Sequence, residues 1–158
     1  MTLSRESLQK IDREISKYPS DQKQSAVMDA LRIAQEEKGW LSPETLGEVA
    51  DYLEMEPIAV YEVASFYNMY DLEPVGKYKL TLCTNLPCAL SGANDVAAYL
   101  KEKLGIGFNE TTADGKYTLK EGECFGSCGH ATVFLLNNRK LCGSLSFAEV
   151  DRILGELE

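Results

Sequence analysis

The sequence lacks the long apolar runs of membrane spans and the apolar leader of secreted proteins. No stretch approaches the roughly 18 to 20 uninterrupted apolar residues that a transmembrane helix needs. The first residues, from Met1 to Glu6, are too polar for a secretory signal peptide. We therefore expect a cytoplasmic chain. It would lie at the cytoplasmic side of a membrane only as part of a larger complex.

Basic residues are also scarce. The chain has 16 Lys and Arg against 25 Asp and Glu, which leaves a formal net charge of −9. Such a chain repels nucleic acid and anionic lipid, and it offers no basic stripe for phosphate groups. A nucleic-acid-binding function is excluded on this ground.

Recognisable nucleotide and catalytic motifs are missing as well. There is no glycine-rich dinucleotide fingerprint after a predicted strand and no Walker motif. His130 is the only histidine, so a cysteine nucleophile would have no other histidine partner. We expect neither an NADH site nor an FMN site on this chain, and no catalytic residues.

What is present is enough apolar material for a core and an odd number of cysteines. The 158 residues are 44% hydrophobic, which suffices for one good core or two small ones without disulfides. Five cysteines in a chain without a secretion signal indicate reduced thiols, and the odd count argues against a disulfide framework. Metal or redox chemistry becomes the leading expectation.

The first seventy or so residues have the apolar spacing of helices, as in Leu8, Ile11 and Ile15. Four helices are expected: one after Ser4 and stopped by Pro19, one from about Asp21 to Lys38, one from Ser42-Pro43 and one from Glu56-Pro57. The sequence therefore predicts an N-terminal helical bundle over residues 1–72.

The pattern changes after the turn-rich segment of residues 71–76. Strands are expected at residues 77–82, 117–119 and 132–136, with a turn at Asn137-Asn138. A helix should follow Cys88, and the capping box that begins at Ser146 predicts a closing helix. The fold class expected is α+β, a helical bundle followed by an α/β domain over residues 73–158.

Four of the cysteines form two close pairs in this second part. Cys83 and Cys88 make a C-x4-C pair at the end of a predicted strand, and Cys124 and Cys128 make a C-x3-C pair in a loop. A [2Fe–2S] cluster takes four thiolates, two for each iron. Glycines beside the second pair let the backbone wrap closely and point amide groups toward sulfur. These four cysteines are the predicted cluster ligands.

The spacing of the cysteines leaves alternatives to this cluster open. A structural zinc site also takes four cysteines, usually in closer C-x2-C pairs, so the spacing favours iron and sulfide but does not settle the metal. A thioredoxin-like disulfide enzyme would need C-x-x-C, which neither pair has. Four buried thiols without any ligand would leave two short, glycine-flanked pairs unexplained.

Two further residues lie near the pairs. Cys142 stands between Leu141 and Gly143 in an apolar stretch and is interpreted as a packing thiol. His130 follows Cys128 by two residues, but a Rieske-type site needs two histidines. We expect His130 to lie near the cluster, or on the surface, without binding iron.

The sequence resembles the thioredoxin-like [2Fe–2S] subunits of respiratory complex I, the E-type subunits of bacterial NADH:quinone oxidoreductase. Four segments carry the resemblance: Val63–Tyr70, Pro74–Tyr78, Cys83–Cys88 and Glu123–Cys128. The resemblance spans nearly the whole chain. One departure is Ala131-Thr132, where members of this family often have proline in place of Thr132.

The resemblance implies a thioredoxin-like domain in which Cys83 and Cys88 hold one iron while Cys124 and Cys128 hold the other. It implies a stable partner, the larger F-type subunit, which binds NADH and FMN and carries a [4Fe–4S] cluster, together with other peripheral-arm subunits of complex I. The chain would then be a non-catalytic electron carrier of the respiratory chain. Its cluster would lie near the flavin, off the main electron path, and exchange single electrons with it.

Three rival functions remain. Small subunits of NAD-linked hydrogenases and formate dehydrogenases share these motifs. A free-standing thioredoxin-like ferredoxin would lack the N-terminal helical part. A zinc-stabilised binding module would have no redox role.

Overall fold

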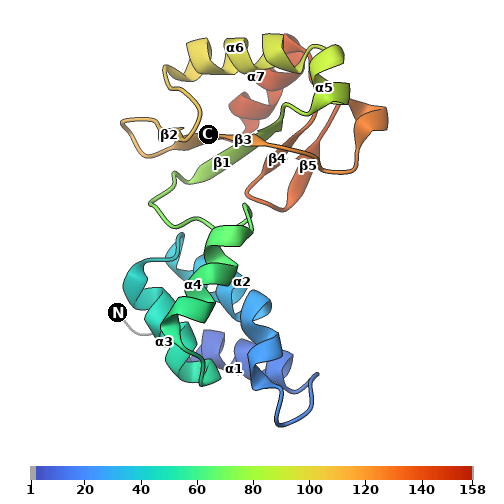
Figure 1. Ribbon diagram of the computed structural model, residues 1–158. Coiled ribbons are helices and arrows are strands. Elements are labelled where there is room, and N and C mark those ends of the chain that lie inside the picture. The colour runs from blue at the N-terminus through green and yellow to red at the C-terminus, as the bar shows by residue number, and fades with distance from the viewer. Residues whose placement is uncertain (1–2, 158) are drawn as a thin grey trace. The chain divides into compact units, whose positions relative to one another are not determined.

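The computed structural model describes residues 3–157, which form two compact units, one ending at Pro74 and one beginning at Val75 (Figure 1). The expected boundary between residues 72 and 73 lies close to this point. That each unit folds as a separate domain stays a prediction. Every helix within residues 3–157 is too short or too polar to cross a membrane.

The first unit is helical. It contains α1 (Arg5–Ile15), the 3-10 turn η1 (Lys23–Ala26), α2 (Val27–Lys38), α3 (Pro43–Leu53) and α4 (Pro57–Phe66). The expected helical N-terminal part is confirmed. The second expected helix, from about Asp21, begins instead as η1 and becomes α-helical only at Val27, as is common for tightened first turns.

Local capping explains where these helices begin and end. The Ser4 hydroxyl accepts a hydrogen bond from the Ser7 amide at 3.2 Å, which starts α1. The Ser42 hydroxyl does the same for the Thr45 amide at 3.2 Å, at the start of α3. Gly39 ends α2 in the left-handed conformation, with φ +84°.

The helices of the first unit share one apolar core. Its buried residues come from all four helices and from the segments before, between and after them: Leu3, Ile11, Ala26, Ala30, Leu31, Ile33, Ala34, Leu41, Leu46, Val49, Ala50, Leu53, Val60, Ala64 and Tyr70. All of them precede Pro74, so this core belongs to the first unit alone.

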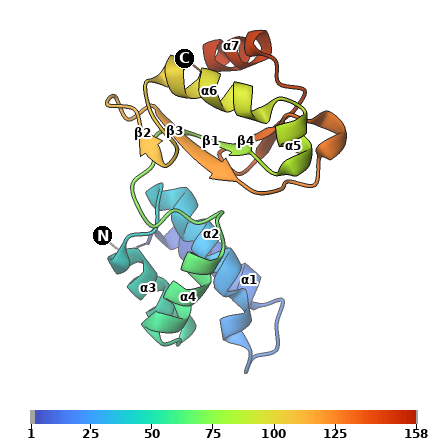
Figure 2. The same cartoon turned by 45° about the horizontal axis from the view of Figure 1, so that its top comes forward.

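The second unit is a mixed sheet with helices. Its elements are β1 (Tyr78–Cys83), α5 (Leu86–Leu90), α6 (Ala93–Leu104), β2 (Glu110–Thr111), β3 (Tyr117–Gly122), η2 (Cys128–His130), β4 (Phe134–Leu136), β5 (Lys140–Cys142) and α7 (Phe147–Glu156). The strand order is β2-β3-β1-β4-β5. Figure 2 shows α6 and α7 lying over the same face of this sheet.

Strand pairing sets the position of the two cysteine loops, which we define as residues 83–88 at the end of β1 and residues 121–130 at the end of β3. β1 and β3 are parallel neighbours in the centre of the sheet, and their register places Cys83 beside Gly122. The remaining pairs are antiparallel, and β4 and β5 form a hairpin. The expected turn lies at its tip, where Asn137 and Asn138 both have positive φ.

A second core fills the space between the sheet and its helices. Leu80, Leu82 and Leu119 of the central strands pack with Leu100 of α6 and Ile153 of α7. Apolar strand residues alternate with polar ones because successive side chains point to opposite faces. The α+β class is confirmed.

Candidate metal centre

The first cysteine pair is buried at the end of β1. Cys83 is the last residue of that strand, and Cys88 lies on the short helix α5, which follows immediately. The two side chains are 2% and 1% exposed and pack with Ala93 and Val133. The structure thus brings this pair together and shields it from water.

The pKa of the Cys88 thiol is raised. Burial is the main cause, because it disfavours the charged thiolate, and a hydrogen bond with Cys83 adds to it. The neighbouring charge of Cys128 acts in the same direction.

The second pair follows β3: Cys124 lies in the loop after this strand, and Cys128 is the first residue of η2. Cys124 and Cys128 are both exposed thiols, unlike the first pair. Gly126, between them, has φ +68°, and its amide donates a hydrogen bond to the Cys124 sulfur at 3.4 Å. This is the amide-to-sulfur contact expected from the glycines of the motif.

Three side-chain hydrogen bonds join the two cysteine loops. The Thr84 hydroxyl donates to the Glu121 carboxylate at 2.7 Å, and the Asn85 amide donates to the Glu123 carboxylate at 3.4 Å. The Cys83 thiol donates to the Glu123 carbonyl at 2.8 Å. Because β1 and β3 are parallel neighbours, both loops leave the same edge of the sheet, where ligands commonly bind in such folds.

Sequence reasoning missed two parts of this arrangement. The helix α5 was not expected, although Asn85 as N-cap and Pro87 in the first turn are a helix-start signal. The contacts of Glu121 and Glu123 were missed as well, since nothing in the local pattern marks either carboxylate.

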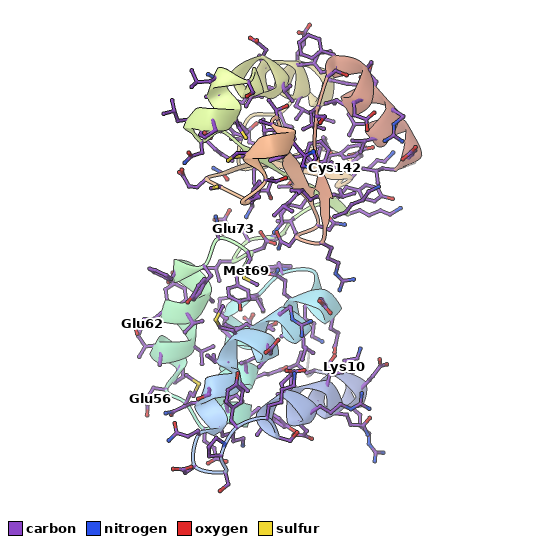
Figure 3. The ribbon with its side chains drawn as sticks, turned by 90° about the vertical axis from the view of Figure 1, so that its right-hand side faces the viewer. Lys10, Glu56, Glu62, Met69, Glu73 and Cys142 are labelled. Atoms are coloured by element: carbon purple, nitrogen blue, oxygen red, sulfur yellow. The ribbon has the colours of Figure 1, made fainter. Side chains whose placement is uncertain are left out.

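The two additional candidates lie outside the cysteine pairs. His130 is exposed, and its carbonyl accepts a hydrogen bond from the Ser144 amide at 2.7 Å. Cys142 is buried in the core of the second unit, and burial raises the pKa of its thiol. Figure 3 labels Cys142 within this unit. Its place is that of a packing residue. The peptide bond between Ala131 and Thr132 is cis.

The donor set fits a [2Fe–2S] cluster in number and chemical type. All four cysteines are free thiols, and each iron of such a cluster takes only two of them. Within residues 3–157, no three or more His, Cys, Asp or Glu side chains are gathered to hold a single metal ion.

The chain is similar in sequence to subunits of NADH-quinone oxidoreductases. The chain is 38% identical over 147 residues to NADH-quinone oxidoreductase subunit 2 of Thermus thermophilus, covering 93% of this chain and 81% of the relative. It is 45% identical over 125 residues to the E-type subunit of NADH-quinone oxidoreductase from Rickettsia typhi, covering 78% of this chain and 74% of the relative.

The fold also has a counterpart among solved structures. An NAD+-reducing [NiFe]-hydrogenase in its H2-reduced state matches 80% of this chain and 22% of the hydrogenase chain, with a TM-score of 0.69 and 20% identity. At this identity the likeness concerns the fold alone, and it confirms the thioredoxin-like architecture. The sequence profile of the thioredoxin-like [2Fe-2S] ferredoxin family matches residues 11–158, and the chain belongs to this family.

Proposed function

We propose that this chain is the electron-transfer subunit of an NADH:quinone oxidoreductase and holds one [2Fe–2S] cluster. Cys83 and Cys88 would hold one iron, and Cys124 and Cys128 the other. The observation that carries the proposal is that two loops joined by hydrogen bonds from Thr84 and Asn85 carry these four thiols, in a chain 38% and 45% identical to subunits of that enzyme. When bound there, the cluster supplies a one-electron couple that can exchange with FMN on a partner subunit.

The residues around the proposed cluster would have different roles. Cys83 and Cys88 lie in an apolar pocket that excludes water from one side. The Gly126 amide directs a partial positive charge at the Cys124 sulfur. Hydrogen bonds to sulfur and solvent exposure both tune the potential of a cluster. The exposed Cys124 and Cys128 mark the side from which a flavin could come within reach.

The proposal assigns the other chemistry to partners. An F-type subunit would bind NADH and FMN and carry a [4Fe–4S] cluster, while this chain acts without catalytic residues of its own. The complex would place it peripherally on the cytoplasmic side of the membrane, among the other peripheral-arm subunits. The hydrogenase and formate dehydrogenase alternatives stay predictions, because the likeness to a hydrogenase extends to the fold only.

Optical and EPR spectra of the anaerobically purified protein test the cluster. We expect a red-brown protein that gives a rhombic EPR signal after reduction by dithionite. Iron and sulfide analysis should give about two of each per chain, the content of one [2Fe–2S] cluster. A colourless protein that contains zinc would overturn the redox function.

Single substitutions test the ligand assignment. Cys124→Ala should abolish the spectrum, because one iron loses a thiolate that lies in an exposed loop and has no role in packing. Cys142→Ala is the matched control, since it removes a thiol from the core and not from the pairs. Retention of the wild-type spectrum by Cys124→Ala would contradict the assignment.

A further inference from the structure

The surface of the first unit has an apolar groove between α3 and α4. The hollow measures about 340 Å³. Its lining consists of Leu41, Pro43, Leu46, Gly47, Pro57, Ile58, Tyr61 and Leu72. Leu41 and Leu46 are buried, whereas Ile58 and Tyr61 are 65% and 48% exposed. Ile58 and Tyr61 are three residues apart on α4, so they share one face of that helix.

This lining is unsuited to a small polar ligand. Sites for small molecules combine apolar walls with a few polar groups that fix the orientation of the ligand. Here Tyr61 supplies the only polar side chain of the lining. Exposed apolar residues that surround a hollow are more typical of a surface that receives side chains of another protein.

The chain segment that lines the groove, within residues 39–76, carries charges of one sign only. Between Lys38 and Lys77 the sequence contains no lysine or arginine. The same stretch holds Glu44, Glu48, Asp51, Glu54, Glu56, Glu62, Asp71 and Glu73. Several of these acids are direct sequence neighbours of residues that line the groove.

Some of these carboxylates are engaged and others are not. Glu48 accepts a hydrogen bond from the Leu3 amide at 2.9 Å, and Glu54 pairs with Lys23 at 2.9 Å. Glu56 and Glu62 contact no cation among residues 3–157. Figure 3 shows these two on the side of the unit opposite α1, which carries Lys10.

The dipoles of α3 and α4 do not cancel the negative charge around the groove. α3 and α4 both begin at the groove, at Pro43 and Pro57, where the end of a helix carries a partial positive charge. Glu44 and Glu56 lie at these two helix starts and offset that charge. The apolar groove is thus bordered by net negative charge.

We propose that this groove binds an apolar segment of another protein chain that is flanked by lysine or arginine. An acidic border repels anionic lipid, nucleic acid and a second copy of this chain, whose own net charge is −9. It attracts a cationic segment and fixes its register. The inference deepens the proposed function, because the partner is taken to be a chain of the same complex.

Photo-crosslinking in the intact complex identifies the occupant. The full chain with Ile58→p-benzoylphenylalanine is expressed in its native host, and the purified complex is irradiated and digested. We expect one crosslinked peptide from a different chain, with apolar residues and more Lys and Arg than Asp and Glu. The same substitution at Tyr18, an exposed residue outside the groove, should not capture that peptide.

Four results would overturn the proposal. They are a crosslink to a second copy of this chain, a crosslink to its own residues 75–158, capture of a peptide in which acids outnumber bases, and no crosslink in a complex that contains the chain.

Charge reversal provides a second measurement. Glu62→Lys should lower the amount of chain retained in the complex during a salt wash by at least about threefold, since a border charge facing a cation is reversed. Glu102→Lys, an equal change at an exposed α6 residue, should leave retention unchanged. Equal retention of the two variants would refute the charge argument. Both variants should keep the cluster spectrum. Retention in the complex therefore tests the groove, and the spectrum tests the proposed redox function independently.

Discussion

At the scale of single residues, Gly122 leaves no room for a side chain at the start of the loop that carries Cys124 and Cys128. A Cβ atom here would lie 2.5 Å from Cζ of Phe125 and 2.9 Å from Cγ2 of Thr81. Phe125 packs against the pocket that buries Cys83 and Cys88. We expect Gly122→Ala to lower the free energy of unfolding by about 1–3 kcal/mol, the usual cost of overpacking, and to reduce iron content.

Gly129→Ala is the matched control for this substitution. Gly129 belongs to the same loop, but an added Cβ would meet nothing within 4 Å. Urea denaturation and iron analysis of the two variants should therefore differ. Equal losses would mean that the loop depends on the flexibility of glycine, and the steric explanation of Gly122 would be wrong.

At the scale of elements, Glu37 joins the end of α2 to the start of α1. Its carboxylate accepts two hydrogen bonds from the Ser4 amide, at 3.1 and 3.0 Å. The hydrogen bond with Lys38 is the main cause that lowers the pKa of Glu37 from 4.5 to about 2, and contacts with Ser7 and Ser4 add to it. A lowered pKa means that folding favours the ionised form.

This shift predicts a pH dependence of stability. The ionised Glu37 stabilises the fold above pH 4.5, and that contribution is lost as the pH falls toward about 2. Glu37→Gln should therefore have a lower urea midpoint than the wild type at pH 7, and the difference should shrink as the pH falls below 4.5 and vanish below about 2. Glu102→Gln, at an exposed site on α6, serves as control. A difference that stays constant with pH would refute the role of the charge.

Some helices and strands could be predicted from the sequence, and others could not. α1 could be predicted because Leu8, Ile11 and Ile15 repeat at helical spacing and Ser4 caps the start. β2 could not, because its two exposed residues, Glu and Thr, become a strand only by pairing with β3. The same holds for the contact of Thr84 with Glu121, which depends on the register of β1 and β3.

At the scale of the whole molecule, the apolar cores are separate. Every residue of the first core precedes Pro74, and the residues that pack around Cys83 and Cys88 all follow Val75. The proposed cluster would therefore stabilise the second unit only. A ligand that binds the folded state alone raises its stability by mass action.

Removal of the cluster should accordingly affect one unit and spare the other. Trp40, the only tryptophan, lies in the first unit, so its fluorescence follows the unfolding of that unit. After treatment with dithionite and EDTA, we expect the midpoint of the fluorescence transition to stay unchanged on heating. Circular dichroism should show a second transition, that of the second unit, and its midpoint temperature should fall by at least about 4 °C. This is the shift that 1 kcal/mol produces in a domain of this size. If the fluorescence midpoint fell together with it, the two units would unfold as one, and the separate cores would not act as separate domains.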